Sequence, residues 1–433
     1  MGQGPRVIYA DRSQLQWDLL DLDGLLEPDH LARVVWWFVE SLDLSPLYDR
    51  IKARDAVAGR PTPDPRVSLA LWLYGALDGV GSARQLARLC EGHVAYRWLR
   101  GGVPVNYHGL SDFRTQDVAL LDRVLSESVA VLAAEGLVDL EELAVDGTKL
   151  RAAAAKGSYR SGRGLEAWQR SAEARIEALK AELEEDPGAG ERRKRAAQER
   201  ARASVRERAA AAKAKLAELQ AEKGERQKTH EAEEQAKGEP LVSSSDPEAR
   251  IMKMADGSWQ PAYNLLLATA PRAMVIVGLA ATDRRNDSGL ALPMVEQVEE
   301  RFGVRPRRLL VDSTMATRED IVGLAEDEAR PVVVYTPVPA DRDDIKPDSL
   351  RKRNWQRRKE PAALKAWRAR MASAAGEGVY GRRRLIETVN GQLKRCGLGR
   401  LRLRGLDKMR CEALLYAIAH NIRRGHILRT AIA

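Results

Sequence analysis

Four residues near the C-terminal end of the chain combine side-chain types and a spacing that suit work on a phosphate. Tyr380, Arg383, Glu387 and Lys394 form the pattern Y-x2-R-x3-E-x6-K in a stretch that is predicted to be helical. At about 100° per residue, they fall within roughly 60° of one another on the helix surface. The two cations would neutralise phosphate oxygens, and the carboxylate would ligate a metal ion. The alternative at this spacing is a row of solvated ion pairs.

Two further acids directly follow short apolar segments that are predicted to be strands. Asp146 comes after residues 143–145, and Asp312 comes after residues 309–311. Acids just past buried strands can reach the carboxyl edge of an α/β sheet, where such sheets place their sites. Taken singly, Asp146 could instead start a turn, and Asp312 could cap a helix.

A meeting of these two aspartates with Glu387 would require a cation, because like charges raise each other's pKa. An all-oxygen set of ligands favours Mg²⁺, with Mn²⁺ as the second choice. Two such ions about 4 Å apart would activate a water or a 3′-hydroxyl and stabilise the leaving oxygen, which serves phosphodiester cleavage and strand transfer. The sequence contains no phosphate-binding G-x-x-x-x-G-K-[ST] loop. His420 is predicted to be structural, because this chemistry needs no imidazole base.

The composition limits the kind of protein this can be. The chain has 433 residues, enough for two or three domains, and 71 Lys and Arg against 62 Asp and Glu give a net charge of +9. The basic residues concentrate in residues 349–370 and 394–429, and such local patches favour nucleic-acid binding. Three scattered cysteines argue against a disulfide framework or a zinc site. Without a signal peptide or a long apolar run, we expect a cytoplasmic protein.

The elements that would position these residues fall into successive parts of the chain. Residues 1–140 are predicted to form an all-α, DNA-binding domain. In it, Asp29 is the expected cap of one helix, and Ser111 the expected cap of a long helix that stops near Gly136. Residues 141–156 are predicted to begin a catalytic α/β domain, which residues 241–433 complete with basic C-terminal helices.

Residues 157–240 interrupt that domain with a stretch rich in Ala, Glu, Arg and Lys. Apolar residues three or four apart, with a break at residues 186–190, predict a coiled-coil helical hairpin. A flexible charged linker is the alternative. Beyond the insertion, the pattern predicts strands at residues 263–270, 273–279, 308–312 and 332–335, and helices at residues 290–302, 317–326 and 412–422.

The order of a strand with Asp, a second strand with Asp and a helix with Glu resembles the RNase H-like fold of DDE transposases. The four C-terminal residues match the Y-R-E-K motif of a large group of bacterial insertion-sequence transposases in residue and spacing. Further segments that are similar to this group are residues 145–149, 243–250, 286–287, 402–406 and 421–424. The turn after Asp312 departs from the family, because Ser-Thr-Met stands where Gly-Tyr is usual.

This resemblance implies an α/β RNase H-like mixed sheet flanked by helices, and a Mg²⁺-dependent transposase. Asp146, Asp312 and Glu387 would ligate the metal ions. Tyr380, Arg383 and Lys394 would contact double-stranded DNA at the terminal inverted repeats, and Arg402 and Arg404 would add to this basic surface. We expect a homodimer or larger assembly on DNA.

Outside the resemblance, Trp355 lies in a basic run and could stack on an exposed base, although packing on its own helix is the alternative. Two other functions stay open from the sequence. One is an RNase H-like nuclease without strand transfer, and the other is an inactive DNA-binding relic or regulator.

Overall fold

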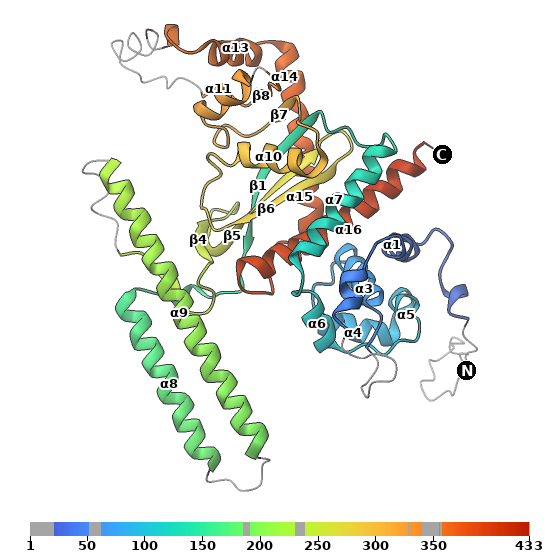
Figure 1. Cartoon of the computed structure of the whole chain (residues 1–433), viewed down its shortest axis with the longest axis vertical. Helices are drawn as coiled ribbons and strands as arrows, with labels where there is room; N and C mark the ends of the chain where they lie inside the picture. Colours follow the sequence, from blue (N-terminus) through green and yellow to red (C-terminus); the bar gives the residue numbers. More distant parts are fainter. Residues whose placement is uncertain are drawn as a thin grey trace, which may run out of the picture.

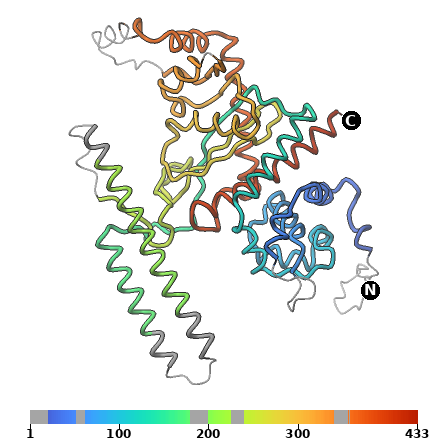
Figure 2. Tube along the Cα trace, viewed as in Figure 1, coloured from blue at the N-terminus to red at the C-terminus, as the bar shows by residue number. Residues whose placement is uncertain are grey.

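The computed structural model describes residues 21–51, 62–184, 191–229, 239–327, 329–339, 355 and 357–432. The structure consists of a helical N-terminal body, a central sheet with its helices, and a projecting helical hairpin that is inserted after the first strand of the sheet (Figure 1). The tube in Figure 2 shows that the long C-terminal helix returns to lie between the sheet and the N-terminal body. No described helix is both long and apolar enough to cross a membrane.

The N-terminal body is helical, as predicted, and packs around a central helix, α3, which is buried on nearly all sides. Trp72 of α3 donates its indole N–H to the carbonyl of Leu110, 2.9 Å away. The helices are α1 (Leu31–Glu40), α2 (Ser45–Asp49), α3 (Pro65–Leu77), α4 (Ala83–Gly92), α5 (Val94–Arg100), α6 (Tyr107–Phe113) and α7 (Val118–Ala134), preceded by the 3₁₀ turn η1 (Asp23–Leu25).

Two of the predicted caps are wrong. His30, rather than Asp29, caps α1, because its Nδ1 accepts the N–H of Ala32 at 3.1 Å. Ser111 lies inside α6, and the chain breaks before a new helix starts after Asp117, whose Oδ1 accepts the N–H of Leu120 at 2.8 Å. The break places Arg114 inside the body, where its guanidinium donates to the carbonyl of Gly81 at 2.8 Å. The predicted long helix is therefore divided into α6 and α7 at the point where the buried guanidinium of Arg114 bonds the carbonyl of Gly81.

The central sheet is mixed, and its topology is compatible with an RNase H-like fold. The strand order is β4-β5-β1-β7-β8, with β6 also paired to β5. β1 runs antiparallel to β5 and parallel to β7, and β8 is parallel to β7. The strands are β1 (Glu142–Arg151), β4 (Arg250–Lys253), β5 (Trp259–Ala270), β6 (Val275–Thr282), β7 (Arg308–Leu310) and β8 (Val333–Tyr335).

The alternation of side chains along these strands gives the sheet two covered faces. Leu143, Val145 and Leu309 pack with α10 (Ala291–Phe302) and α11 (Arg318–Glu326). On the opposite face, Ala144 and Leu310 belong to the same core as α15 (Arg384–Arg395) and α16 (Leu406–Thr430). Even-numbered residues of β1 therefore face α15, which decides where Asp146 points.

Helix α16 holds the edge of the sheet through Asn421, which is 1 % exposed. Its Nδ2 donates to the carbonyl of Ile276 at 2.7 Å, and its Oδ1 accepts the N–H of the same residue at 2.9 Å. β6 pairs only with β5, so the amide stands where a further strand would pair.

We therefore expect Asn421→Ala to lower the free energy of unfolding by about 3 kcal/mol, because both main-chain groups of Ile276 lose their partner inside the core. Urea unfolding followed by circular dichroism measures this change. Arg423→Ala on the exposed side of the same helix is the matched control, and it should stay within about 0.5 kcal/mol of wild type. Equal stability of the two variants would contradict the bracing role.

The stability of the protein should depend on pH because His420, the residue before Asn421, is buried. Burial lowers its pKa from 6.5 to about 4, while its Nε2 lies 2.8 Å from the carbonyl of Met274. Because the unfolded chain binds the proton more tightly, stability should fall as the pH drops from about 6.5 to 4, by on the order of 3 kcal/mol. Urea unfolding at pH 7 and pH 5 tests this, and His420→Gln should flatten the difference. An unchanged slope in that variant would assign the acid sensitivity to other groups.

The helical hairpin consists of α8 (Gly162–Glu184) and α9 (Glu191–Thr229), which pack against each other. Leu165 of α8 shares a small core with Ala212, Leu216 and Leu219 of α9. At its base, β2 (Tyr159–Arg160) pairs antiparallel with β3 (Val242–Ser243), after the short turn η2 (Lys156–Ser158). The chain thus leaves the sheet domain and returns to it at one point. The predicted helix breaker at residues 186–190 lies outside the described residues, and coiled-coil packing stays a prediction.

Candidate active site

The register of β1 and β7 places the first two predicted acids, Asp146 and Asp312, side by side along the strand direction. Ala144 of β1 pairs with Leu310 of β7 in parallel, so Asp146 and Asp312 each lie two residues further in the same direction. Both share the parity of residues that face α15. Asp146 does not end its strand as predicted, because Gly147 to Arg151 continue to pair with β5. The acid therefore sits in the middle of a rigid strand.

Helix α15, which packs on the same face of the sheet, carries the third predicted acid, Glu387. Ile386, Val389 and Leu393 are buried in the core shared with the sheet, and they fix the helix. Glu387 lies in the first turn of α15, and its side chain is 60 % exposed. The apolar side of the helix thus presents Glu387 at the rim of the face that carries Asp146.

Arg383 joins two of the acids. Its Nη2 donates to Asp146 Oδ1 at 2.8 Å, and its Nη1 donates to Glu387 Oε1 at 2.9 Å. The side chain is only 13 % exposed, and it also interacts electrostatically with Asp312 and Tyr380. Arg383 therefore bonds two of the predicted acids directly and interacts with the third electrostatically.

The other motif residues surround this group. Tyr380 ends α14 (Ala374–Tyr380), Arg383 lies in the 3₁₀ turn η3 (Gly381–Arg383), and Lys394 is exposed in the last turn of α15. The motif is thus spread over three consecutive helical segments and not over the single helix that was expected. Burial raises the pKa of the Tyr380 hydroxyl, and the charges of Asp312 and Glu387 add to the shift.

The electrostatics of Asp146 fit a cation-binding carboxylate. Burial raises its pKa, Glu387 and Asp287 raise it further, and Arg383 opposes them. In the described part of the chain, no three His, Cys, Asp or Glu side chains lie close enough to share a metal ion. Two of the acids nevertheless already share one cation, and the exposed Glu387 can turn without disturbing the core. The all-oxygen donor set suits Mg²⁺ or Mn²⁺.

Asn390, one turn after Glu387, is a site residue that the sequence did not reveal. It is 7 % exposed, and its Nδ2 donates to Asp146 Oδ2 at 3.0 Å, while its Oδ1 has no hydrogen-bond partner. Asp146 is thus held by Arg383 through one oxygen and by Asn390 through the other. Nothing in the sequence pattern singles out Asn390, because its role depends on how α15 lies across β1.

Asp287, in the loop after β6, is a fourth acid close to Asp146. A methyl group built on Gly147 would lie 2.6 Å from the carboxylate of Asp287, so a glycine is needed there. Asn264 of β5 donates to this carboxylate, and Asn264 Oδ1 is buried without a partner. The similarity of residues 286–287 to the transposase group was the available signal for this residue.

We expect Asn390→Leu to lower cleavage activity about 10- to 100-fold, the usual cost of losing a hydrogen bond that orients a ligating carboxylate. The variant keeps a side chain of similar size but leaves Asp146 Oδ2 without its donor. Initial cleavage rates on a labelled DNA duplex measure the effect, with Gln392→Ala on the same helix as the control. Wild-type rates in Asn390→Leu would show that Asp146 keeps its orientation without the amide.

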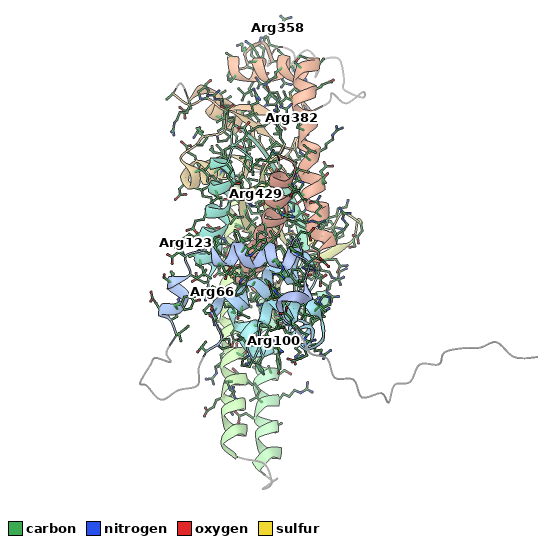
Figure 3. The ribbon with its side chains drawn as sticks, turned by 90° about the vertical axis from the view of Figure 1, so that its right-hand side faces the viewer. Arg66, Arg100, Arg123, Arg358, Arg382 and Arg429 are labelled. Carbon is green, nitrogen blue, oxygen red and sulfur yellow. The ribbon has the colours of Figure 1, made fainter. Side chains whose placement is uncertain are left out.

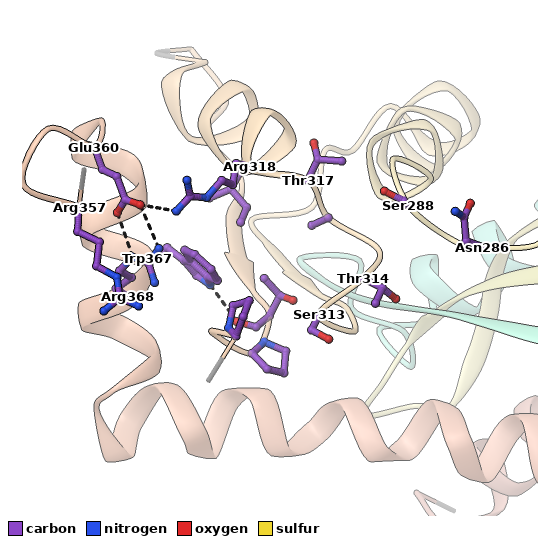
Figure 4. Close-up of a pocket in the computed structure, with 15 residues that line it drawn as sticks. Asn286, Ser288, Ser313, Thr314, Thr317, Arg318, Arg357, Glu360, Trp367 and Arg368 are labelled. Atoms are coloured by element: carbon purple, nitrogen blue, oxygen red, sulfur yellow. Dashed lines mark hydrogen bonds and ion pairs between the residues drawn. The ribbon is translucent and has the colours of Figure 1, made fainter. Parts of the chain in front are cut away.

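A cleft of about 710 Å³ is lined by the residues that directly follow Asp312 in the chain. Figure 4 shows two of them, Ser313 and Thr314. Ser313 and Thr314 line one side of it, and Trp367 of α13 (Ala362–Met371) lies on the other, with its indole N–H bonded to the carbonyl of Thr336 at 2.9 Å. Figure 4 also shows Glu360 bonded to Arg318 and Arg368. The unusual turn after Asp312 therefore forms a polar wall next to the candidate site.

The remaining predicted contacts lie away from the acids. Trp355 is 57 % exposed, and the Nζ of Lys359 lies 4.0 Å from its ring centre. Arg402 and Arg404 are exposed in the loop between α15 and α16, and Arg404 Nε donates to the carbonyl of Ala153 at 3.1 Å. The structure does not bring these residues together with Arg383.

Comparisons with known proteins identify two transposase domains in the chain. Residues 225–422 match a family described as the transposase DDE domain, and residues 20–116 match one described as a transposase domain (DUF772). Asp312 and Glu387 fall within the first match, and Asp146 precedes it. No curated protein and no solved structure gives a significant match. The chain thus combines a transposase DDE domain with a helical transposase domain that precedes it, which indicates a DNA transposase.

Proposed function

We propose that this transposase belongs to the Y-R-E-K group, binds the terminal inverted repeats of an insertion sequence, and catalyses metal-dependent strand cleavage and strand transfer. The observation that supports the proposal is the ion-paired group of Asp146, Arg383 and Glu387, with Asp312 two residues beyond the same pair of strand residues as Asp146. Acids from two neighbouring strands and one crossing helix can serve a shared centre.

Asp146, Asp312 and Glu387 would hold Mg²⁺, or Mn²⁺ in its place, as one or two ions. When bound, these ions would supply activation of the attacking hydroxyl and stabilisation of the leaving oxygen. Asn390 orients the carboxylate of Asp146 by donating a hydrogen bond to Asp146 Oδ2. The pairing of β1 with β7 keeps Asp146 level with Asp312 along the strand direction. Glu387, the exposed member, closes the group when its side chain turns inward.

The cations and aromatic side chains around the acids would bind DNA. Arg383 and Lys394 would contact phosphates near the end of the element, and Tyr380 would position that strand. Trp355 would stack on an exposed base, which its open ring face permits. The N-terminal body, residues 1–140, would contribute to recognition of the repeats, with residues 141–156 and 241–433 as the catalytic domain and residues 157–240 as the insertion. Assembly on DNA would involve at least a dimer.

A test of the function uses linear DNA that carries the short inverted repeats flanking the reading frame, together with a supercoiled target plasmid. We expect cleavage at the repeat ends and joined products with Mg²⁺ or Mn²⁺, and neither product with EDTA. Cleavage without joining would identify a nuclease instead. The absence of metal-dependent cleavage would identify a DNA-binding relic.

A further inference from the structure

A second cationic feature lies at the far end of β1 from the candidate site. Arg151, at the end of β1, and Arg400, Arg402 and Arg404, in the loop after α15, line a cleft of about 710 Å³. The other lining residues are Gly397, Leu401 and Ala152 to Ala155, so no carboxylate is among them. All four arginines are exposed.

The cleft is held in shape by main-chain hydrogen bonds. The N–H of Arg151 donates to the carbonyl of Gly399 at 3.0 Å, and the N–H of Leu401 donates to the carbonyl of Arg151 at 2.8 Å. Arg404 Nε donates to the carbonyl of Ala153 at 3.1 Å and ties the rim of the loop to the segment after β1. The arginines are therefore presented by a fixed backbone, which reduces the entropy lost on binding.

These arginines differ from several others on the surface. Figure 3 labels Arg66, Arg100, Arg123, Arg382 and Arg429, and each of these pairs with an acid. Within the described residues, none of the four cleft arginines forms an ion pair.

Three acids interact electrostatically with these arginines. The exposed Asp256 interacts with Arg151, the buried Glu412 with Arg402, and the buried Asp246 with Arg404. The remaining positive charge of the cleft is available to an anion.

We propose that this cleft binds the sugar–phosphate backbone of double-stranded DNA several nucleotides away from the bond that is cut. Arg151 follows Asp146 by five residues along β1, which corresponds to about 17 Å. At about 3.4 Å per nucleotide along one strand, this separation spans roughly five nucleotides. An unbranched polyanion suits a cleft whose cations lie in a row along one loop and one strand end.

The inference rests on the proposed function only for the position of the cut. The affinity of the cleft for DNA is a separate quantity and needs no divalent ion. Fluorescence anisotropy with a labelled random-sequence duplex of about 30 base pairs, in EDTA and over a salt series, measures it. Arg151 and Arg400 are the residues to change, because the hydrogen bonds that hold them come from the main chain and survive truncation.

In the double variant Arg151→Ala/Arg400→Ala, we expect the slope of log affinity against log salt to become shallower by about two, and the dissociation constant at low salt to rise at least tenfold. Arg151→Lys/Arg400→Lys keeps the charge and should retain most of the slope. Arg272→Ala, an exposed arginine in the turn at the opposite end of β5, is the control and should bind like wild type.

A wild-type salt slope in the alanine double variant, with an unchanged melting temperature, would overturn the proposal. A second experiment tests the distance. A cleavable duplex that extends fewer than about five base pairs from the cut towards the cleft cannot reach the cleft arginines. On this duplex, the double variant and wild type should bind with the same affinity. Loss of cleavage in a triad variant with an intact salt slope would separate failure of the chemistry from failure of the cleft.

Discussion

Replacement of Glu387 by Gln is expected to lower the rate of DNA cleavage roughly 1000-fold, which equals about 4 kcal/mol of transition-state stabilisation. Gln keeps the size of Glu and can still accept the hydrogen bond from Arg383 Nη1. It lacks the negative charge that a carboxylate ligand supplies to a divalent ion. Because the side chain is 60 % exposed, the substitution should leave the fold intact. Single-turnover cleavage of a labelled element end with Mg²⁺ gives the rate.

The control is Glu377→Gln, which changes an exposed acid of α14 that makes no described side-chain contact. It should cleave at the wild-type rate, and both variants should bind DNA within about twofold of wild type, since neither change removes a cation. Cleavage by the Glu387 variant within tenfold of wild type would remove Glu387 from the triad. A parallel loss of binding would mean that the substitution disturbs the DNA surface and not the chemistry.

Much of the fold was readable from the sequence, because local signals and packing agree there. The apolar runs of β5 and β6, separated by a short turn, predicted two adjacent strands, and the structure pairs them antiparallel. Thr317 and Asp320 form a capping box at the start of α11, where a helix was predicted. The prediction for Ser111 was wrong because the sequence around it is uniformly helical, while Arg114 at the break contacts the carbonyl of Gly81 in the turn between α3 and α4.

The candidate site was only partly readable. Its three acids were found from their order along the chain, and the register of β1 and β7 explains why that order matters. The second half of β1 was not predicted, because it contains the polar residues Thr148 and Lys149. Pairing with β5, and not hydrophobicity, makes this region a strand. Asn390 and the ion pair between Arg383 and Asp146 could not be predicted, because each joins segments whose approach is set by the packing of α15.

Arg383→Gln is expected to move two measured quantities in opposite directions. The affinity for Mn²⁺ should rise at least tenfold, because the guanidinium and the metal ion compete for the same carboxylate oxygens of Asp146 and Glu387. A unit charge about 4 Å from another contributes up to roughly 4 kcal/mol at an effective dielectric constant near 20, and tenfold needs only about 1.4 kcal/mol. The rate of DNA cleavage should fall about 100-fold, because the variant loses the cation that would hold the phosphate.

Titration calorimetry with Mn²⁺ measures the first quantity without any turnover, and the cleavage assay measures the second. The neighbouring residue provides the control, because Arg382 pairs with the buried Glu142 on the same face of β1. Arg382→Gln should lower the free energy of unfolding and leave the affinity for Mn²⁺ unchanged. If Arg383→Gln instead weakens Mn²⁺ binding, then Arg383 assembles the acids and does not compete with the ion. Opposite shifts in the two assays would mean that the guanidinium occupies the carboxylates until the metal ion displaces it, and that it then binds the phosphate.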